Sequence, residues 1–383
     1  MSYTVLARRY RSRTFDEVVG QEHVALTLKK AIETGRVAHA YLFCGTRGVG
    51  KTSMARIMAA ALQAPDTDER QGPSSEFEPD QEWAYRIFKG EDLDVIEIDA
   101  ASNTGVDNVR EIIENAQYRP AHSRFKVYII DEVHMLSKAA FNALLKTMEE
   151  PPGHVKFILA TTEPERVPAT ILSRVQRYDF RNIPTAEIAG HLRDVVESEK
   201  READDEALML VAKAGAGSMR DALSLLDRLL SVGDKLTAEH IVQMLGMPRQ
   251  QALADLTDAI GNGAIGQVLE QTEAMLAAGL SGESLVTALS DHLRDLLLMA
   301  TCGKDTDLVE PAGLERSTLA TQADKFTPAD LAQDIAILED LKRNLRGGTG
   351  RALLDATLVR LTLASQFTPV NELLDGAKKK LTA

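Results

Sequence analysis

The stretch Gly45-Thr46-Arg47-Gly48-Val49-Gly50-Lys51-Thr52 decides how the first half of this 383-residue chain folds. It matches the pattern G-x-x-x-x-G-K-[ST], in which a glycine-rich loop between a strand and a helix holds phosphate groups. The apolar run Ala40–Cys44 precedes the loop. Apolar residues at helical spacing follow it, namely Met54, Ile57, Met58, Ala61 and Leu62. An ordinary glycine-rich turn is the alternative, but the strand-loop-helix context favours a nucleoside triphosphate site.

Each residue type in this loop has a chemical task. The glycines let the backbone curl so that successive N–H groups point at phosphate oxygens, and the start of the next helix also favours an anion. Lys51 would reach the β and γ phosphates, and the Thr52 hydroxyl would bind Mg²⁺. The predicted nucleotide-binding residues of this segment are Gly45, Thr46, Arg47, Gly48, Val49, Gly50, Lys51, Thr52 and Ser53.

A second candidate group follows the apolar run 125–130, where Asp131 and Glu132 end a predicted strand. In a parallel sheet the carboxyl ends of the strands form the ligand face, so both carboxylates should lie beside the phosphates. Asp131 would hold Mg²⁺ and Glu132 would orient or deprotonate the attacking water. Thr162, after the predicted strand 155–160, would sense the γ-phosphate through its hydroxyl; its alternative role is a turn or helix cap.

The order of these segments predicts an α/β fold followed by helices. Short β-branched runs at 93–98, 125–130 and 155–160 alternate with helical patterns at 109–118 and 139–148, which is typical of a parallel sheet with helices on both faces. After residue 184 the strand signal disappears, and helical patterns punctuated by glycines continue to about residue 367. Within the predicted α/β part, the proline-rich and acidic segment 63–90 is expected to form a surface loop.

Composition sets limits on the class of protein. The length suggests two or three domains, and 44% hydrophobic and 26% charged residues are ordinary for a globular protein. Neither a run of roughly 20 apolar residues nor the apolar region of a signal peptide occurs, so we predict a cytoplasmic protein without a membrane segment. Cys44 and Cys302 are too few for a disulfide framework. The net charge of −13 neither indicates nor excludes nucleic-acid binding.

Several separated motifs resemble those of AAA+ ATPases, and more closely those of the gamma/tau family of bacterial DNA polymerase III clamp loader subunits. These motifs are the opening segment 10–21, the loop at 45–52, Asp131-Glu132-Val133-His134, the segment 142–152, Ser173-Arg174 and the segment 217–222. The resemblance implies an AAA+ P-loop domain with a five-stranded parallel sheet at 1–180. It also implies a small helical lid domain at 181–246, an all-helical collar domain for oligomerisation at 247–370 and a tail at 371–383.

The resemblance also implies roles for single residues. Arg174 would be an arginine finger that acts in trans on the neighbouring subunit's nucleotide, joining Lys51, Asp131, Glu132 and Thr162 in catalysis. Arg220, on a lid helix, would reach the phosphates of its own site. Tyr10, Arg11 and Val19 would line the adenine pocket. Without the resemblance, both arginines read as surface charges.

DNA contacts and the absence of zinc are implied in the same way. Ser102, Asn103, Thr104 and Lys146 occupy positions that face DNA in the family, although the first three also fit a turn before a helix near Val106. Family members usually carry four zinc-binding cysteines after the loop helix, and 63–90 contains none, so we predict no zinc. Val175 after the finger and Ser12 after Tyr10-Arg11 also depart from the family pattern, and neither change removes a chemical group.

The predicted function is that of an ATP-driven, Mg-dependent motor subunit of the clamp loader. Its predicted partners are other clamp loader subunits in a ring, expected to be a pentamer, the sliding clamp and primer-template DNA. It would be a component of the DNA-directed DNA polymerase holoenzyme without polymerase chemistry of its own. The alternatives are a related branch-migration motor, a structural ring subunit without hydrolysis and, more remotely, a GTPase, for which no guanine-reading Asn-Lys motif occurs.

Overall fold

The computed structural model describes residues 4–67, 71–102, 105–231, 233, 235–309, 314–345 and 350–364. The chain forms two compact units, which divide after Lys235. The tail predicted at 371–383 and two of the predicted DNA contacts, Asn103 and Thr104, lie outside the described residues. None of the helices in the described ranges is both long enough and apolar enough to cross a membrane.

A five-stranded sheet forms the centre of the first unit, in the order β2-β3-β4-β1-β5. Each neighbouring pair is parallel, as the register of the paired residues shows. The strands are β1 Ala40–Cys44, β2 Val95–Asp99, β3 Lys126–Asp131, β4 Val155–Thr161 and β5 Gln176–Asp179. The predicted parallel sheet of five strands is confirmed. The hydrophobic pattern alone did not indicate β5, because only Tyr178 of its four residues is buried.

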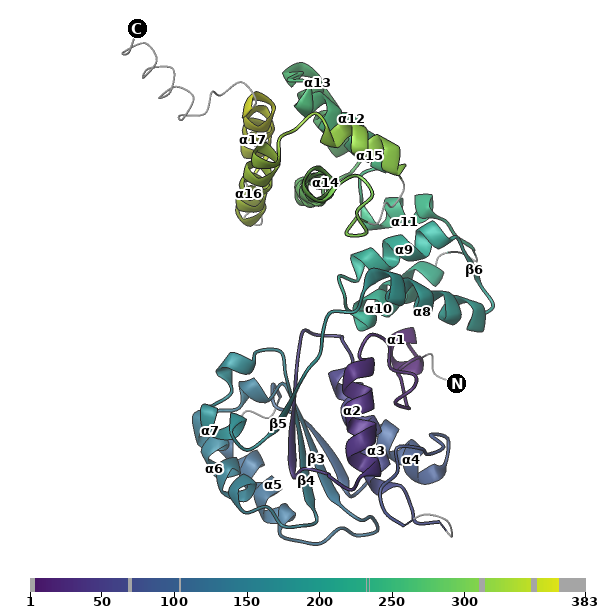
Figure 1. The fold of residues 1–383 in the computed structure, drawn as a ribbon, viewed down its shortest axis with the longest axis vertical. Helices are drawn as coiled ribbons and strands as arrows, with labels where there is room; N and C mark the ends of the chain where they lie inside the picture. Colours follow the sequence, from purple (N-terminus) through teal and green to yellow (C-terminus); the bar gives the residue numbers. More distant parts are fainter. Residues whose placement is uncertain are drawn as a thin grey trace. The chain divides into compact units, whose positions relative to one another are not determined.

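Helices cover both faces of this sheet (Figure 1). Along β1, Tyr41 and Phe43 pack into one core with helices α2 and α3, whereas Leu42 and Cys44 pack into the other core with α5 and α6. This alternation follows from the period of two along a strand. The helices in this part of the chain are α1 Leu6–Arg9, α2 Glu22–Glu33, α3 Lys51–Gln63, α4 Glu82–Lys89, α5 Val106–Ala116, α6 Lys138–Glu149 and α7 Ala169–Leu172.

The acidic segment 63–90 contains a helix that its composition did not indicate. Helix α4 lies there, and Phe77, Trp83 and Phe88 pack against the core beside α3. The Phe77 ring lies 5.8 Å from Trp83 and 6.4 Å from Phe88, measured between centroids. Aromatic packing therefore holds the described part of this segment against the sheet.

Short elements connect the sheet to a helical part of the same unit. The two 3₁₀ turns are η1 Val133–Met135 and η2 Pro164–Arg166. The helices that follow the sheet are α8 Thr185–Ser198, α9 Asp205–Ala214 and α10 Met219–Leu230. Two-residue strands, β6 Glu202–Ala203 and β7 Lys235–Leu236, form a second small sheet. Helix α10 packs against α1, which brings the N-terminal segment and the helical part together.

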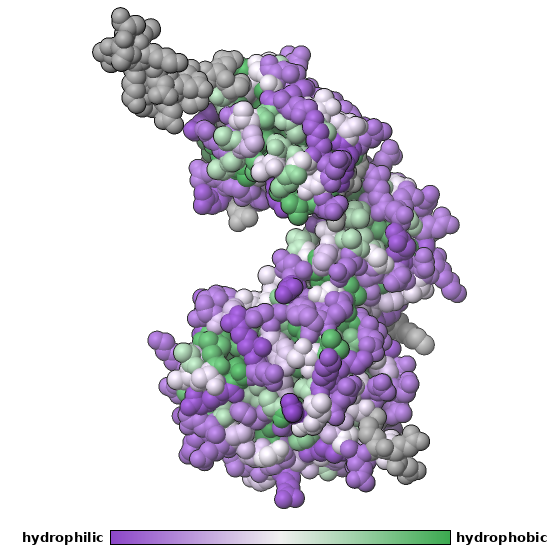
Figure 2. All heavy atoms as spheres, viewed as in Figure 1, coloured by the Kyte–Doolittle hydropathy of each residue, from purple (hydrophilic) through white to green (hydrophobic). Residues whose placement is uncertain are grey.

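The described part of the second unit beyond Leu236 consists of helices joined by turns and loops, without a further strand. Its helices are α11 Ala238–Leu245, α12 Gln250–Gly261, α13 Ile265–Ala277, α14 Gly282–Cys302, α15 Arg316–Ala323, α16 Pro328–Leu345 and α17 Arg351–Leu363. The long helix α14 packs against α16 and α15 and buries a leucine stripe that includes Leu285, Leu289 and Leu296. On the face in Figure 2 the surface is mostly hydrophilic, with hydrophobic residues scattered between.

Candidate nucleotide-binding site

The phosphate loop lies between β1 and α3, as the sequence predicts. Gly48 and Gly50 have φ angles of +80° and +102°, in the left-handed region that favours glycine. A Cβ atom on Gly48 would lie 1.9 Å from the Ser218 hydroxyl oxygen. No side chain caps the start of α3, so its first N–H groups remain available to an anion.

Lys51 is buried at the base of this loop. Its side-chain nitrogen donates hydrogen bonds to the carbonyl oxygens of Gly45, at 2.7 Å, and Thr46, at 2.9 Å. Burial lowers the pKa of Lys51, while the nearby carboxylates of Glu132 and Asp131 act in the opposite direction. The loop therefore holds a cation beside the two carboxylates that the sequence places at the end of β3.

Thr52 and Asp131 are brought together by the sheet. The Thr52 hydroxyl donates to Asp131 Oδ2 at 2.7 Å, and the Glu132 N–H donates to Asp131 Oδ1 at 2.9 Å. A hydroxyl and a carboxylate are oxygen donors of the kind that Mg²⁺ prefers. The chemistry of this pair fits a magnesium ion beside bound phosphates.

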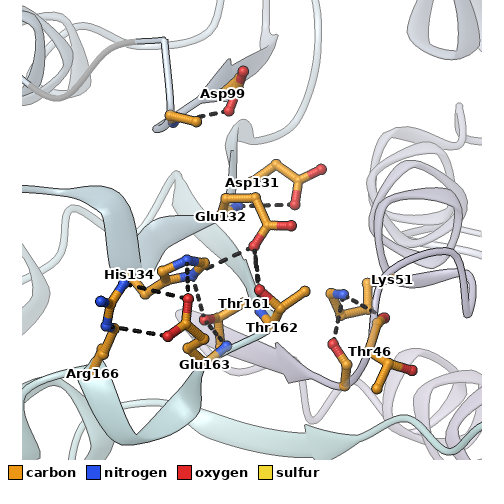
Figure 3. Close-up of polar contacts among 12 residues, drawn as sticks. Thr46, Lys51, Asp99, Asp131, Glu132, His134, Thr161, Thr162, Glu163 and Arg166 are labelled. Carbon is orange, nitrogen blue, oxygen red and sulfur yellow. Dashed lines mark hydrogen bonds and ion pairs between the residues drawn. The ribbon is translucent and has the colours of Figure 1, made fainter. Parts of the chain in front are cut away.

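The Glu132 carboxylate contacts Thr162, just after β4, and His134 in the turn η1 (Figure 3). Its Oε2 accepts from the Thr162 hydroxyl at 3.0 Å and from the Thr162 N–H at 3.3 Å. The same oxygen lies 3.4 Å from His134 Nδ1. Glu132 has φ +47°, a conformation that a non-glycine residue adopts at a cost of roughly 1–3 kcal/mol. The backbone is therefore strained at the residue predicted to act on water.

A pocket of about 450 Å³ lies over the loop. Of the predicted residues, Gly45, Thr46, Thr162 and Arg174 are not among its lining residues. The predicted residues that line it are Tyr10, Arg11, Val19, Arg47, Gly48, Val49, Gly50, Lys51, Thr52, Ser53, Asp131, Glu132 and Arg220.

The sequence reasoning missed part of this pocket wall. The additional lining residues are Ala7, Ser12, Val18, Asp99, Ala101, Ile183, His191, Met219 and Leu223. Met219 and Leu223 lie four residues apart on α10, on either side of Arg220, and this i, i+4 spacing places them on one face of the helix. His191 is a single residue on α8, and no local pattern marks it; burial lowers its pKa.

The helical part of the unit contacts the loop directly. Ser218 caps α10 by accepting from the Asp221 N–H at 3.2 Å, and the Arg220 N–H donates to the Gly48 carbonyl at 3.4 Å. The Arg220 side chain is exposed at the pocket. The Tyr10 hydroxyl donates to the Glu199 carboxylate just after α8, and burial followed by this bond raises the pKa of Tyr10.

Arg11 is partly buried in the pocket wall. Burial, followed by the charge of Arg56, lowers the pKa of Arg11. Arg56 itself is paired with Glu97 through two hydrogen bonds, at 2.6 and 2.9 Å. Arg11 therefore contributes a positive charge to the pocket wall on the side of the N-terminal segment.

Arg174 lies away from this pocket. Its guanidinium pairs with Glu149 at 2.7 Å and donates to the Thr170 carbonyl at 2.7 Å. About a third of the side chain is exposed, at 33%. The structure thus brings together the predicted loop and strand-end residues but leaves the predicted finger outside their site.

The two described candidates for DNA contact are exposed. Lys146 lies on α6, and the Ser102 hydroxyl donates to Asp99 Oδ2 at 2.8 Å. The N-cap of α5 is Gly105, which has no side-chain capping bond, so Ser102 does not cap that helix. In the described ranges, His, Cys, Asp and Glu form no group of three or more able to hold a metal ion; the absence of zinc stays a prediction.

This parallel sheet, phosphate loop and helical cover define the AAA+ class of P-loop proteins, and three protein-family models agree. Residues 20–184 match "DNA polymerase III, delta subunit", residues 187–235 match "DNA polymerase III clamp loader subunit, ATPase lid domain", and residues 236–376 match "DNA polymerase III subunits gamma and tau domain III". The predicted lid and collar folds are confirmed by these matches.

Curated relatives carry the same names. DNA polymerase III subunit tau of Bacillus subtilis is 44% identical over 79% of this chain and 53% of its own length. DNA polymerase III subunit gamma/tau of Mycobacterium bovis is 36% identical over 98% of this chain and 65% of its own length. DNA polymerase III subunit gamma of Buchnera aphidicola is 42% identical over 68% of this chain and 71% of its own length. The chain belongs to the DNA polymerase III gamma/tau family. It spans about half the length of several curated relatives.

Proposed function

We propose that this chain binds and hydrolyses ATP to drive the opening and loading of a sliding clamp onto primed DNA. The observation that carries the proposal is the convergence of Lys51, the Thr52–Asp131 pair and Glu132 on one pocket. Family membership supports the same function, because the matching lid model is that of a clamp loader ATPase.

The residues of the pocket divide the chemistry between them. Lys51 would exchange its two carbonyl partners for phosphate oxygens and stabilise their charge. Thr52 and Asp131 would hold Mg²⁺, which supplies charge neutralisation at the phosphates when bound. Glu132 would orient or deprotonate the attacking water, and Thr162, which holds the Glu132 carboxylate, would report the state of the γ-phosphate.

Some of the proposed roles require the assembled ring of subunits. Arg174 would act in trans, since its guanidinium lies outside the pocket of its own chain and remains partly exposed. Arg220 would contact the phosphates of its own site, and Tyr10, Arg11 and Val19 would border the adenine. Other clamp loader subunits in a ring of five, the sliding clamp and primer-template DNA are the proposed partners.

DNA would contact Ser102, Asn103, Thr104 and Lys146. Such contacts to phosphates are independent of base sequence and weaken as salt rises. The chain would act within the polymerase holoenzyme and carry out no polymerase chemistry. The acidic net charge of −13 is compatible with this role because a basic surface can be local.

ATP turnover by the assembled subunits, measured with and without primed DNA and a sliding clamp, tests the proposal. We expect turnover to rise only when both are present, as a burst followed by a slower steady rate. Turnover stimulated equally by branched DNA without a clamp would favour the branch-migration motor. Tight ATP binding with no turnover under any condition would favour a structural ring subunit.

A further inference from the structure

A chain of polar contacts runs from Glu132 to the protein surface (Figure 3). The His134 ring lies between two carboxylates, with Nδ1 3.4 Å from Glu132 Oε2 and Nε2 3.1 Å from Glu163 Oε1. The other Glu163 oxygen lies 3.2 Å from Arg166 Nε. Three side chains thus connect the candidate base to the turn η2.

The His134 ring is held tightly in this position. Its side chain is only 5% exposed, and its Nδ1 also lies 3.0 Å from the Thr161 hydroxyl. That hydroxyl accepts from the Glu163 N–H at 3.0 Å, which fixes the start of the turn. Buried polar groups need partners, and among the described residues the ring contacts Glu132, Thr161 and Glu163, which lie at or just after the carboxyl ends of β3 and β4. Movement of Glu163 therefore changes the surroundings of the ring.

We propose that His134 and Glu163 are positioning residues for Glu132. The imidazole sets the place of the Glu132 carboxylate together with Thr162, and Glu163 sets the place of the imidazole. This inference rests on the proposed function, which makes Glu132 the group that acts on water. It goes beyond that function because it makes the rate of hydrolysis depend on a side chain outside the pocket.

The outer end of the chain is accessible. The side chains of Glu163 and Arg166 are 41% and 58% exposed. An exposed ion pair of this kind contributes little to stability and is readily rearranged. The turn that carries it leads directly into α7 and then Arg174. A contact made on this turn would therefore reach the hydrolytic site through His134.

Replacing Glu163 tests the inference with little risk to folding. We expect Glu163→Ala to lower kcat for ATP by about tenfold, as loss of an orienting partner does at other sites. KM and the affinity for a fluorescent ATP analogue should change less than twofold, because Glu163 does not line the pocket. Glu165→Ala is the matched control, since Glu165 is exposed on the same turn and should behave like the unaltered chain.

A double-mutant cycle separates positioning from a general structural effect. If Glu163 acts through Glu132, Glu163→Ala should have no further effect on single-turnover hydrolysis when combined with Glu132→Gln. His134→Leu should lower kcat at least as much as Glu163→Ala, and His134→Gln, which keeps a polar group of similar reach, should recover part of it.

Three results would overturn the inference: unchanged kcat in Glu163→Ala, a change confined to KM, or an equal further loss in the Glu132→Gln background. If His134→Leu fails to fold, Glu163→Ala, alone and combined with Glu132→Gln, still tests the inference. The failure of the proposed function looks different, because the assembled unaltered subunits would then show no hydrolysis with primed DNA and a sliding clamp present.

Discussion

Ser218 lies directly over Gly48, so the cap of helix α10 and the phosphate loop are in contact. The Ser218 hydroxyl caps α10 through the Asp221 N–H, and a Cβ on Gly48 would lie 1.9 Å from that hydroxyl oxygen. The capping bond holds the hydroxyl in place. The position of the helical part therefore depends on the conformation of the loop that holds phosphate.

Gly48→Ala should separate α10 from the loop. The substitution costs about 1 kcal/mol for the left-handed backbone and adds the clash with Ser218. We expect faster amide hydrogen exchange at the start of α10 and weaker nucleotide binding. Gly50→Ala is the control, because it has the same kind of backbone strain with no atom within 4 Å of the added Cβ. Equal rates of amide hydrogen exchange at the start of α10 in both variants would show that the contact between Gly48 and Ser218 does not hold α10 against the loop.

Arg174→Ala should leave nucleotide binding intact and lower hydrolysis in the assembled ring by about 10³-fold. The loss of its exposed ion pair with Glu149 should change stability by less than about 1 kcal/mol. Arg177→Ala, which removes a neighbouring exposed ion pair with Asp179, should have no effect on hydrolysis. Steady-state turnover and binding of a fluorescent ATP analogue distinguish the two variants.

A mixing experiment tests whether Arg174 acts in trans. Chains with Lys51→Met cannot hold phosphate but keep the finger, whereas chains with Arg174→Ala keep the site. Rings with adjacent copies of the two variants should regain hydrolysis at the junctions that combine an intact site with an intact finger. Mixed rings no more active than the Arg174→Ala rings would argue that the finger acts within its own chain.

Asp334 should make the second unit less stable at high pH. This carboxyl on α16 is 2% exposed, and its Oδ1 has no hydrogen-bond partner among the described residues. Burial, followed by the charge of Asp330, raises the pKa of Asp334 from 3.8 to about 7. Since the folded state holds this proton more tightly, the stabilisation is complete below about pH 4 and is lost as pH rises through 7.

Asp334→Asn should remove this dependence of the second unit's stability on pH. At pH 8 we expect the variant to be more stable than the unaltered chain by a few kcal/mol, with the difference shrinking toward pH 5. Hydrogen exchange of α16, compared between chains at the same pH, measures the effect within this unit. Asp340→Asn on the exposed side of the same helix is the control. A constant difference across the pH range would rule out titration of Asp334.

Removal of metal ions should leave the segment 63–90 folded. The segment has no cysteine and contains the single tryptophan of the chain, so fluorescence of Trp83 reports on it selectively. A zinc chelator should not shift the emission, whereas Phe77→Ala should shift it to longer wavelength, because Phe77 packs against the Trp83 ring. A chelator-induced shift that added zinc reverses would show that the segment depends on metal.

Features encoded by residues adjacent in the chain were predictable. The phosphate loop is one contiguous stretch, and the central strands are short, nearly continuous apolar runs, as expected for a parallel sheet covered on both faces. The pairing of Thr52 with Asp131 was also predictable, because a general rule places the carboxyl ends of parallel strands at one edge. Helix α4 and strand β5 were missed, since acidic composition and exposed positions conceal them.

The sequence by itself determined that this chain has a P-loop fold with a nucleotide site and a helical remainder. Only the tertiary structure decided that His134 lies between Glu132 and Glu163, that Tyr10 reaches Glu199, and that Arg174 stays outside the pocket. These contacts depend on how turns place side chains to within a few tenths of an ångström. Hydrophobic periodicity specifies which face of an element is buried, and it carries no information at that scale.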